Sequence, residues 1–211
     1  MTFDEAVSQC ALIAVLRGIT PDEVGPVSTT LHGAGIRIVE VTLNSPEPYE
    51  SIGRLAGKFG DRLVIGAGTV LSEADVNLVK VHGGRIAVAP DCNPAVIARA
   101  LSLGLEPVPG VFTPTEAFTA IRAGARHLKF FPAEASTPTT LRAWRAVLPM
   151  AIKTYAVGGI TPDNMEPWIA AGASGFGIGS NLYRPGRGLD EIAKAASQFV
   201  AGWRKATGRI K

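Results

Sequence analysis

Residues 127–158 read HLKFFPAEASTPTTLRAWRAVLPMAIKTYAVG, and this stretch contains one complete unit of strand, helix and strand. The apolar segments His127-Pro132 and Lys153-Gly158 are typical of buried strands. Between them, Pro138-Val147 has the amphipathic spacing of a helix and opens with a proline that follows a threonine, a common helix start. Strands joined through a helix usually run parallel, so this stretch predicts an α/β fold.

The same alternation repeats along all 211 residues, without a linker or a low-complexity break. The other predicted strands are Ala11-Leu16, Arg37-Leu43, Leu63-Thr69, Arg85-Pro90, Glu106-Gly110 and Gly175-Gly179. The other predicted helices are Asp22-His32, Pro46-Phe59, Ser72-Val81, Pro94-Leu103, Pro114-Ala123, Pro162-Ala171 and Leu189-Trp203. We therefore expect residues 1–211 to form a single domain.

Eight strand and helix units predict a (β/α)8 TIM barrel. A doubly wound open sheet is the alternative. The first strand is not followed by the Gly-x-Gly-x-x-Gly turn that would favour such a sheet. The segment Thr2-Phe3-Asp4-Glu5 resembles a capping box, and it predicts a short extra helix at the N-terminus, below the barrel.

Composition excludes several classes of protein. With 46% hydrophobic residues and a net charge of +3, the chain is typical of a globular protein, and it has no basic run interleaved with aromatic residues. Nucleic acid is therefore not an expected partner. The uncharged stretch Pro167 to Tyr183 is short and rich in glycine, so we expect no membrane span.

Cellular location follows from cysteine usage and from the first residues. Two cysteines, Cys10 and Cys92, do not make a disulfide framework, and acidic residues stand near the N-terminus where a secretory leader would be positive. Both features predict a cytoplasmic protein. The three histidines share no ligand spacing, so no metal site is expected.

Lys129 is the unusual residue of the predicted strand His127-Pro132. Burying an ammonium group is costly, so the pKa of a buried lysine falls until the amine is substantially neutral and nucleophilic. A lysine paired with a carboxylate for structural reasons is the alternative. The competing lysine, Lys153, begins its strand and therefore lies near the opposite end of the barrel from the usual site of catalysis.

Side chains alternate along a strand, so Lys129 faces the barrel interior if its neighbours face the helices. The same parity turns Glu40, Arg17 and Thr69 inward, and we expect all four groups in one cavity. This set suits imine chemistry on an α-keto acid: the lysine condenses with the keto group, the carboxylate moves protons, and the arginine and threonine hold the substrate carboxylate. An ion pair from Glu40 to Lys129 or Arg17 is the structural alternative.

Two glycine-rich segments follow the last two predicted strands. They are Val157-Gly158-Gly159-Ile160, which precedes a predicted helix start at Thr161-Pro162-Asp163, and Gly177-Ile178-Gly179-Ser180, which precedes Asn181. Glycines permit close backbone approach, and helix amino termini present unpaired N–H groups to anions. Together the segments predict a phosphate site.

Five segments resemble those of a known family in order and spacing over nearly the whole chain, namely the class I 2-keto-3-deoxy-6-phosphogluconate aldolases and their phosphogalactonate relatives. The segments are Val39-Glu40-Val41-Thr42-Leu43, Gly66-Ala67-Gly68-Thr69-Val70, Lys129-Phe130-Phe131-Pro132, Gly158-Gly159-Ile160 and Gly179-Ser180. The resemblance implies that Lys129 forms a Schiff base with the keto acid and that Glu40 accepts and donates protons. It also implies that the carboxylate is held by Arg17 and Thr69, and the phosphate by Gly159, Gly179 and Ser180.

Two positions bear on which sugar acid is cleaved. The phosphogluconate branch typically has arginine where this chain has Asn44 and threonine where it has Val157, and both residues here resemble the phosphogalactonate branch. We therefore expect retro-aldol cleavage of 2-dehydro-3-deoxy-6-phosphogalactonate to pyruvate and glyceraldehyde 3-phosphate. The gluconate epimer, which differs only at C4, is the alternative as main or additional substrate.

The resemblance further implies a homotrimer that acts on a small phosphorylated keto acid and uses no metal or other cofactor. A phosphosugar isomerase or synthase barrel is an alternative of another class, since it would share the phosphate loops but need no imine. A non-catalytic phosphosugar-binding barrel is a third reading, and the inward Glu40 and Lys129 argue against it.

Overall fold

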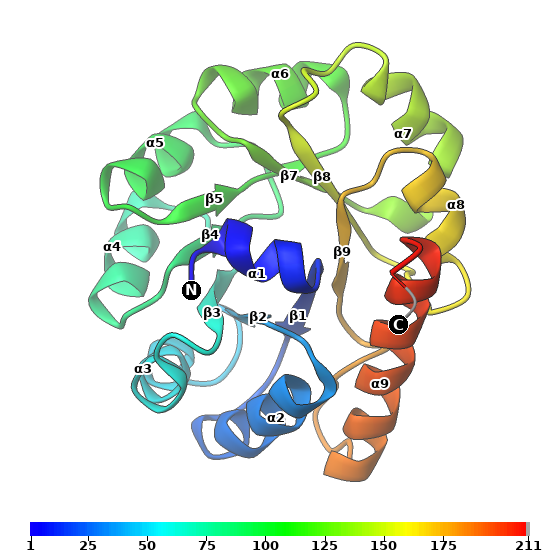
Figure 1. Ribbon diagram of the computed structural model, residues 1–211. Helices are drawn as coiled ribbons and strands as arrows, with labels where there is room; N and C mark the ends of the chain where they lie inside the picture. The colour runs from blue at the N-terminus through cyan, green and yellow to red at the C-terminus, as the bar shows by residue number, and fades with distance from the viewer. Residues whose placement is uncertain (210–211) are drawn as a thin grey trace.

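The computed structural model describes residues 1–209, so Lys211 and the end of the predicted 1–211 domain lie outside the described residues. Parallel strands form a nearly closed barrel, and helices surround it (Figure 1). The predicted α/β barrel with an extra N-terminal helix is confirmed. No helix within residues 1–209 is long and apolar enough to cross a membrane.

The strands are β1 (Leu12–Leu16), β2 (Ile38–Thr42), β3 (Val64–Gly68), β4 (Ile86–Val88), β5 (Glu106–Val108), β6 (Gly110–Val111), β7 (His127–Phe130), β8 (Lys153–Val157) and β9 (Gly175–Ile178). The helices are α1 (Phe3–Gln9), α2 (Pro21–Ala34), α3 (Pro48–Phe59), α4 (Glu73–Val81), α5 (Pro94–Ser102), α6 (Pro114–Arg122), α7 (Pro138–Arg145), α8 (Met165–Ala170) and α9 (Leu189–Ala206). A short 3-10 helix, η1, spans Ala133–Ala135.

The strand order around the sheet is β5-β4-β3-β2-β1-β9-β8-β7-β6, so the ring is interrupted between β5 and β6. The sequence predicted these two as one strand, Glu106-Gly110. Pro109 separates them, because proline has no N–H to donate to a neighbouring strand. Its carbonyl still accepts a hydrogen bond of 2.8 Å from the Lys129 amide. A side chain at Gly110 would overlap the Pro90 carbonyl, so glycine allows β6 to lie close to the segment that follows β4.

The amino end of the barrel is closed by α1, which crosses the ring in Figure 1. Its capping box is present: the Thr2 hydroxyl accepts from the Glu5 amide at 3.2 Å, and the Glu5 carboxylate accepts from the Thr2 amide at 2.7 Å. Phe3 and Ala6 then pack inside the barrel among aliphatic side chains of the first five strands and Tyr155. The interior of the barrel is thus filled at its amino end.

Side chains of β7 alternate between the two layers of the core. Phe130 faces outward, where its ring centroid lies 4.9 Å from that of Trp144 on α7 and 5.8 Å from that of Trp168 on α8. Leu128 belongs to the same outer cluster. Lys129 therefore points to the interior of the barrel.

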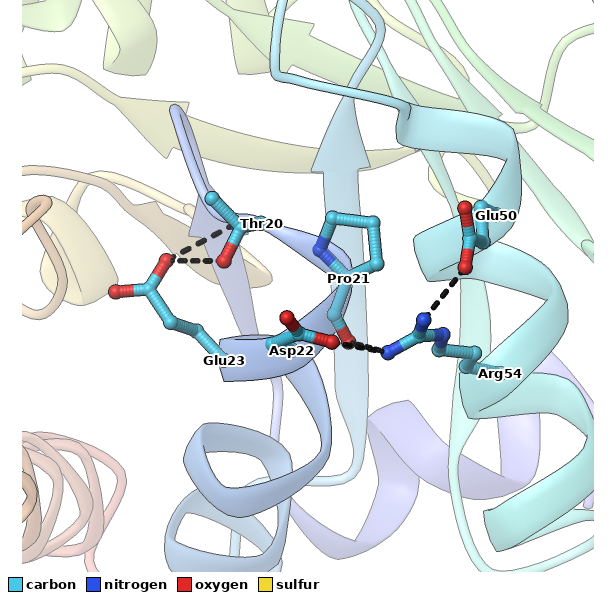
Figure 2. Close-up of polar contacts among 6 residues, drawn as sticks. All are labelled: Thr20, Pro21, Asp22, Glu23, Glu50 and Arg54. Carbon is cyan, nitrogen blue, oxygen red and sulfur yellow. Dashed lines mark hydrogen bonds and ion pairs between the residues drawn. The ribbon is translucent and has the colours of Figure 1, made fainter.

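Polar contacts at the start of α2 tie it to α3 (Figure 2). The Glu23 carboxylate accepts from the amide and hydroxyl of Thr20, at 3.1 and 2.7 Å. Arg54 on α3 pairs with Asp22 at 2.7 Å and with Glu50 at 2.6 Å. These groups are largely exposed, so the pairs add little to the stability of the fold.

Candidate active site

A cavity of about 530 Å³ opens at the carboxyl ends of β1, β7, β8 and β9. Its wall is formed by Val15, Arg17, Gly18, Lys129, Phe131, Glu134, Val157, Gly158, Gly159, Ile160, Gly177, Gly179, Ser180, Asn181, Tyr183, Arg184 and Pro185. Two other hollows of about 600 Å³ lie beside α1 and between α8 and α9. Neither contains a lysine from a barrel strand. A further hollow of about 470 Å³, between α1 and α9, is lined by Lys153, but this lysine begins β8 and therefore lies at the amino end of the barrel. We place the site in the cavity at the carboxyl ends, where parallel barrels carry their catalytic groups.

Lys129 is only 6% exposed. Its Nζ lies 4.6 Å from the centroid of the Phe131 ring, the next inward-facing side chain. Burial lowers the pKa of Lys129, the Glu40 carboxylate opposes this effect, and the Arg17 guanidinium adds to it. A lysine amine whose charged form is disfavoured in this way is suited to attack a carbonyl carbon.

Glu40 on β2 is 1% exposed, and its Oε2 has no hydrogen-bond partner in the part of the chain that the structure describes. Burial raises the pKa of Glu40 to about 7, although Lys129 and Arg17 favour its ionised form. A side chain on Gly68 would overlap the Glu40 carboxylate, so glycine at this position leaves room for it. Glu40 is not part of the cavity wall, and no ion pair within 4.0 Å joins it to Lys129 or Arg17 among residues 1–209.

Arg17 lies just beyond β1 and lines the cavity, where its Nη1 donates to Asn44 Oδ1 at 3.1 Å. Thr69 lies just beyond β3 but is not part of the cavity wall. The sequence predicted four polar groups in one cavity. The structure places Lys129 and Arg17 in the cavity wall, and Glu40 near enough to both for their charges to affect its pKa. Thr69 has a φ of +60°, a turn that strand alternation does not anticipate, and its role in the site stays a prediction.

The predicted glycine loops lie side by side in the wall. Gly158 and Gly159 have φ values of +110° and +66°, which favour glycine. Within residues 1–209, the amides of Gly159, Ile160, Ser180 and Asn181 have no acceptor in the protein. Unpaired N–H groups that converge on a cavity can bind an anion such as phosphate.

The loop that supplies these N–H groups is not followed directly by a helix, as the sequence had predicted. The sequence predicted a helix from Pro162 directly after the loop, whereas α8 begins at Met165. The Thr161 amide instead donates to Asn164 Oδ1 at 3.0 Å, and Asn164 Nδ2 donates to the Gly159 carbonyl at 2.9 Å. A side-chain-stabilised turn thus takes the place of the expected helix start, because asparagine competes for local backbone groups.

Sequence reasoning missed Glu134, Asn181 and Arg184, which also line the cavity. Glu134 lies in the short 3-10 helix η1, and the other two lie in an irregular segment after β9, so neither a period of two nor a period of 3.6 assigns a direction to these side chains. Their position after predicted strand ends was the one available signal. Among residues 1–209, no group of three or more His, Cys, Asp and Glu side chains is placed to hold a metal ion.

A model of the aldolase family described as KDPG and KHG aldolase matches residues 3–195. The chain belongs to this aldolase family. It is therefore a carbon–carbon lyase of the class that works through a lysine Schiff base, and the buried Lys129 is the lysine of its cavity.

The aldolase resembles the 2-dehydro-3-deoxy-6-phosphogalactonate aldolase of Escherichia coli strain K12, with 45% identity over 195 residues that cover 92% of this chain and 95% of the relative. A solved structure described as native KDPGal has 45% identity and a TM-score of 0.92, with 93% of this chain and 96% of that chain covered. A cube-shaped protein cage designed by fusing symmetric oligomeric domains has 44% identity and a TM-score of 0.94, with 95% of this aldolase and 74% of the cage chain covered.

Proposed function

We propose that this aldolase cleaves 2-dehydro-3-deoxy-6-phosphogalactonate to pyruvate and D-glyceraldehyde 3-phosphate, as a step of galactonate degradation. The observation that carries the proposal is Lys129, a buried lysine in the cavity wall whose pKa is influenced by the buried carboxyl of Glu40. The phosphogalactonate relatives named above supply the substrate class. Arg17 is the cation beside Lys129 and holds the substrate carboxylate.

In the proposed mechanism the neutral amine of Lys129 attacks the keto carbon C2, and water leaves as the iminium forms. The C4 hydroxyl gives its proton to the Glu40 carboxylate, C4 becomes the aldehyde carbon, and the iminium accepts the electron pair of the breaking C3–C4 bond. The product on Lys129 is an enamine. Glu40 returns a proton to C3, and water then hydrolyses the imine to release pyruvate.

The two glycine loops hold the phosphate at the far end of the substrate. Gly159, Gly179 and Ser180 line the cavity beside one another. The unpaired amides of Gly159 and Ser180, with those of Ile160 and Asn181, offer hydrogen bonds without a counter-charge. With C2 fixed at Lys129 and the phosphate fixed at these loops, C4 passes beside Val157, which also lines the cavity.

The proposed substrate preference is tested by pyruvate release, measured with the two C4 epimers side by side. We expect the galactonate epimer to be favoured in kcat/KM by a factor of roughly ten to a few hundred, because Val157 offers a methyl group where a hydroxyl could bind the other epimer. Equal rates, or a preference for the gluconate epimer, would contradict the assignment. Lys129→Arg should abolish pyruvate release, whereas an isomerase or synthase without an imine would retain turnover.

We also infer a homotrimer in the cytoplasm. The likeness to a cage built from symmetric oligomeric domains supports an oligomer, and the free cysteines Cys10 and Cys92 suit a reducing compartment. Apolar side chains on the surface, such as Val81 at 78% exposure, are candidates for the interface. Light scattering should give three times the chain mass of 22.0 kDa, and a monomer mass would refute the trimer.

A further inference from the structure

We propose that Glu134 binds the C5 hydroxyl of the substrate, the secondary hydroxyl of its aldehyde half. It would thereby select phosphorylated aldehydes by the configuration at that carbon. The inference rests on the proposed function, because it takes the imine at Lys129 and the phosphate at the glycine loops as the two ends of the bound substrate.

Glu134 belongs to η1, directly after the strand that carries Lys129, and it lines the same cavity. Its carboxylate lies against the loop that follows β8. Its Oε2 is 2.8 Å from the place where a Cβ on Gly158 would lie and 3.3 Å from the corresponding place on Gly159. The absence of side chains at these two glycines gives the carboxylate its space beside the loop.

The Glu134 carboxylate is also free to accept hydrogen bonds. Within residues 1–209 it takes no hydrogen bond from a protein donor, and no ion pair within 4.0 Å joins it to Arg184, which lines the same cavity. Other acidic side chains accept hydrogen bonds from backbone amides at the starts of helices. Glu116, for example, accepts from the amides of Phe112 and Thr113. Glu134 has no such structural duty, so its oxygens remain available to a ligand.

The chemistry of a carboxylate decides which part of the substrate it can bind. An ionised carboxylate accepts hydrogen bonds but repels a phosphate and the substrate carboxylate. A hydroxyl is the complementary group, and the substrate carries its hydroxyls between the keto carbon and the phosphate. Glu134 lies beside Gly158 and Gly159, at the border of the phosphate loops, which corresponds to C5 more closely than to C4 at the breaking bond.

The experiment uses the reaction in the direction of synthesis, with pyruvate and either D- or L-glyceraldehyde 3-phosphate. The two aldehydes have the same formula and charge and differ only in the direction of the hydroxyl that becomes the C5 hydroxyl. We expect the wild type to favour the D form by about tenfold or more in kcat/KM, since a hydrogen bond to a charged group discriminates by that order. Glu134→Ala should bring the preference to within about threefold, mainly through a loss of kcat/KM for the D form.

Glu134→Gln keeps the shape of the side chain and one acceptor oxygen, so its preference should fall between the wild type and Glu134→Ala. The matched control is Glu166→Ala, an exposed glutamate on α8 outside the cavity, which should keep the wild-type preference. An unchanged preference in Glu134→Ala would overturn the inference.

Exchange of the pyruvate methyl protons with D2O separates this inference from the proposed function. Pyruvate lacks the aldehyde half, so its exchange needs the Lys129 imine but not Glu134. Glu134→Ala should therefore exchange pyruvate at a rate within about twofold of the wild type. Loss of exchange in that variant would overturn the inference, because Glu134 would then act at the imine. Loss of exchange in the wild type would overturn the proposed function and the inference together.

Discussion

Burial affects Lys129 and Glu40 in the same manner, because both side chains lose the water that stabilises their charges. It lowers the pKa of Lys129, and it raises the pKa of Glu40 to about 7. Their mutual attraction opposes both changes but does not cancel them. Near neutral pH, the carboxyl can therefore both accept and donate a proton, and the amine loses its proton more readily than an exposed lysine does, as imine chemistry requires.

The buried carboxyl of Glu40 makes the free energy of unfolding depend on pH. Its pKa in the folded state, about 7, lies above the ordinary 4.5, so between these values the folded state binds more protons than the unfolded state. The contribution of the Glu40 carboxyl to the free energy of unfolding is therefore fully present below pH 4.5 and is lost as the pH rises through 7. Glutamine has no such dependence. Glu40→Gln should unfold with a free energy roughly 1 to 3 kcal/mol above the wild type at pH 8, and the gain should be smaller at pH 5.

Urea unfolding at one fixed protein concentration measures this difference, since an oligomer's stability depends on concentration. A gain of the same size at both pH values would show that Glu40 does not titrate as described. The variant should also exchange the pyruvate methyl protons at least about a hundredfold more slowly, because it cannot accept a proton.

At the scale of single residues, strand alternation was sufficient to place Lys129 and Glu40 in the barrel interior. The rule does not extend to Thr69, whose positive φ departs from the extended geometry that the rule assumes. It was silent on Glu134, because the direction of a side chain in the short η1 turn depends on the tertiary structure.

At the scale of elements, α1 serves as a plug for the amino end of the barrel. Phe3 is 6% exposed, and its ring meets the His127 ring edge-on with the centroids 4.8 Å apart. This packing lies at the opposite end of the barrel from the cavity. Stability and catalysis should therefore be separable at α1.

Phe3→Ala tests that separation. Removing a buried phenyl ring should lower the free energy of unfolding by about 3 kcal/mol, because the site leaves a cavity under the barrel. Turnover of the folded enzyme should remain within about twofold of the wild type. Met150→Ala is the control, since this side chain is 90% exposed and its truncation should change stability by less than about 0.5 kcal/mol. Loss of turnover in folded Phe3→Ala would show that α1 also shapes the site.

Element boundaries were predicted well where caps were explicit, as at Thr2 for α1 and Thr113 for α6. They were wrong where proline or asparagine changed the hydrogen bonding locally. Pro109 divides the fifth predicted strand in two. The side chain of Asn164 accepts from the Thr161 amide and stabilises a turn where the predicted Pro162-Ala171 helix would begin. The hydrophobic pattern alone predicts neither effect, since it indicates which side chains are buried but not which backbone amides are hydrogen-bonded.

At the scale of the whole molecule, the barrel keeps a titratable cluster at its closed end as well as a site at its open end. His127 is 2% exposed, with Nε2 3.3 Å from Asp4 Oδ1 and Nδ1 3.0 Å from the Tyr155 hydroxyl. Burial lowers the pKa of His127 to about 4, against the attraction of Asp4. The other charged groups that face this histidine are Glu106, Arg126 and Lys153.

The cluster predicts acid sensitivity. Between pH 6.5 and 4 the unfolded state binds a proton at His127 that the folded state excludes, so stability falls as the pH decreases through this range. Replacing His127 with glutamine removes this pH-dependent contribution to stability, because glutamine does not titrate. Thermal unfolding at pH 7 and pH 4.5 should therefore show a smaller drop in Tm for His127→Gln than for the wild type, even if the variant is less stable at pH 7. An equal drop would assign the acid sensitivity to other groups.

The most direct test of the account is borohydride reduction of the enzyme in the presence of pyruvate, followed by peptide mass spectrometry. Reduction of an imine fixes the three carbons of pyruvate to the lysine through a stable C–N bond. We expect one modified peptide, which contains Lys129, and no modification at Lys153 or in the Lys129→Arg variant. An enzyme that releases pyruvate but carries no adduct at Lys129 would contradict it.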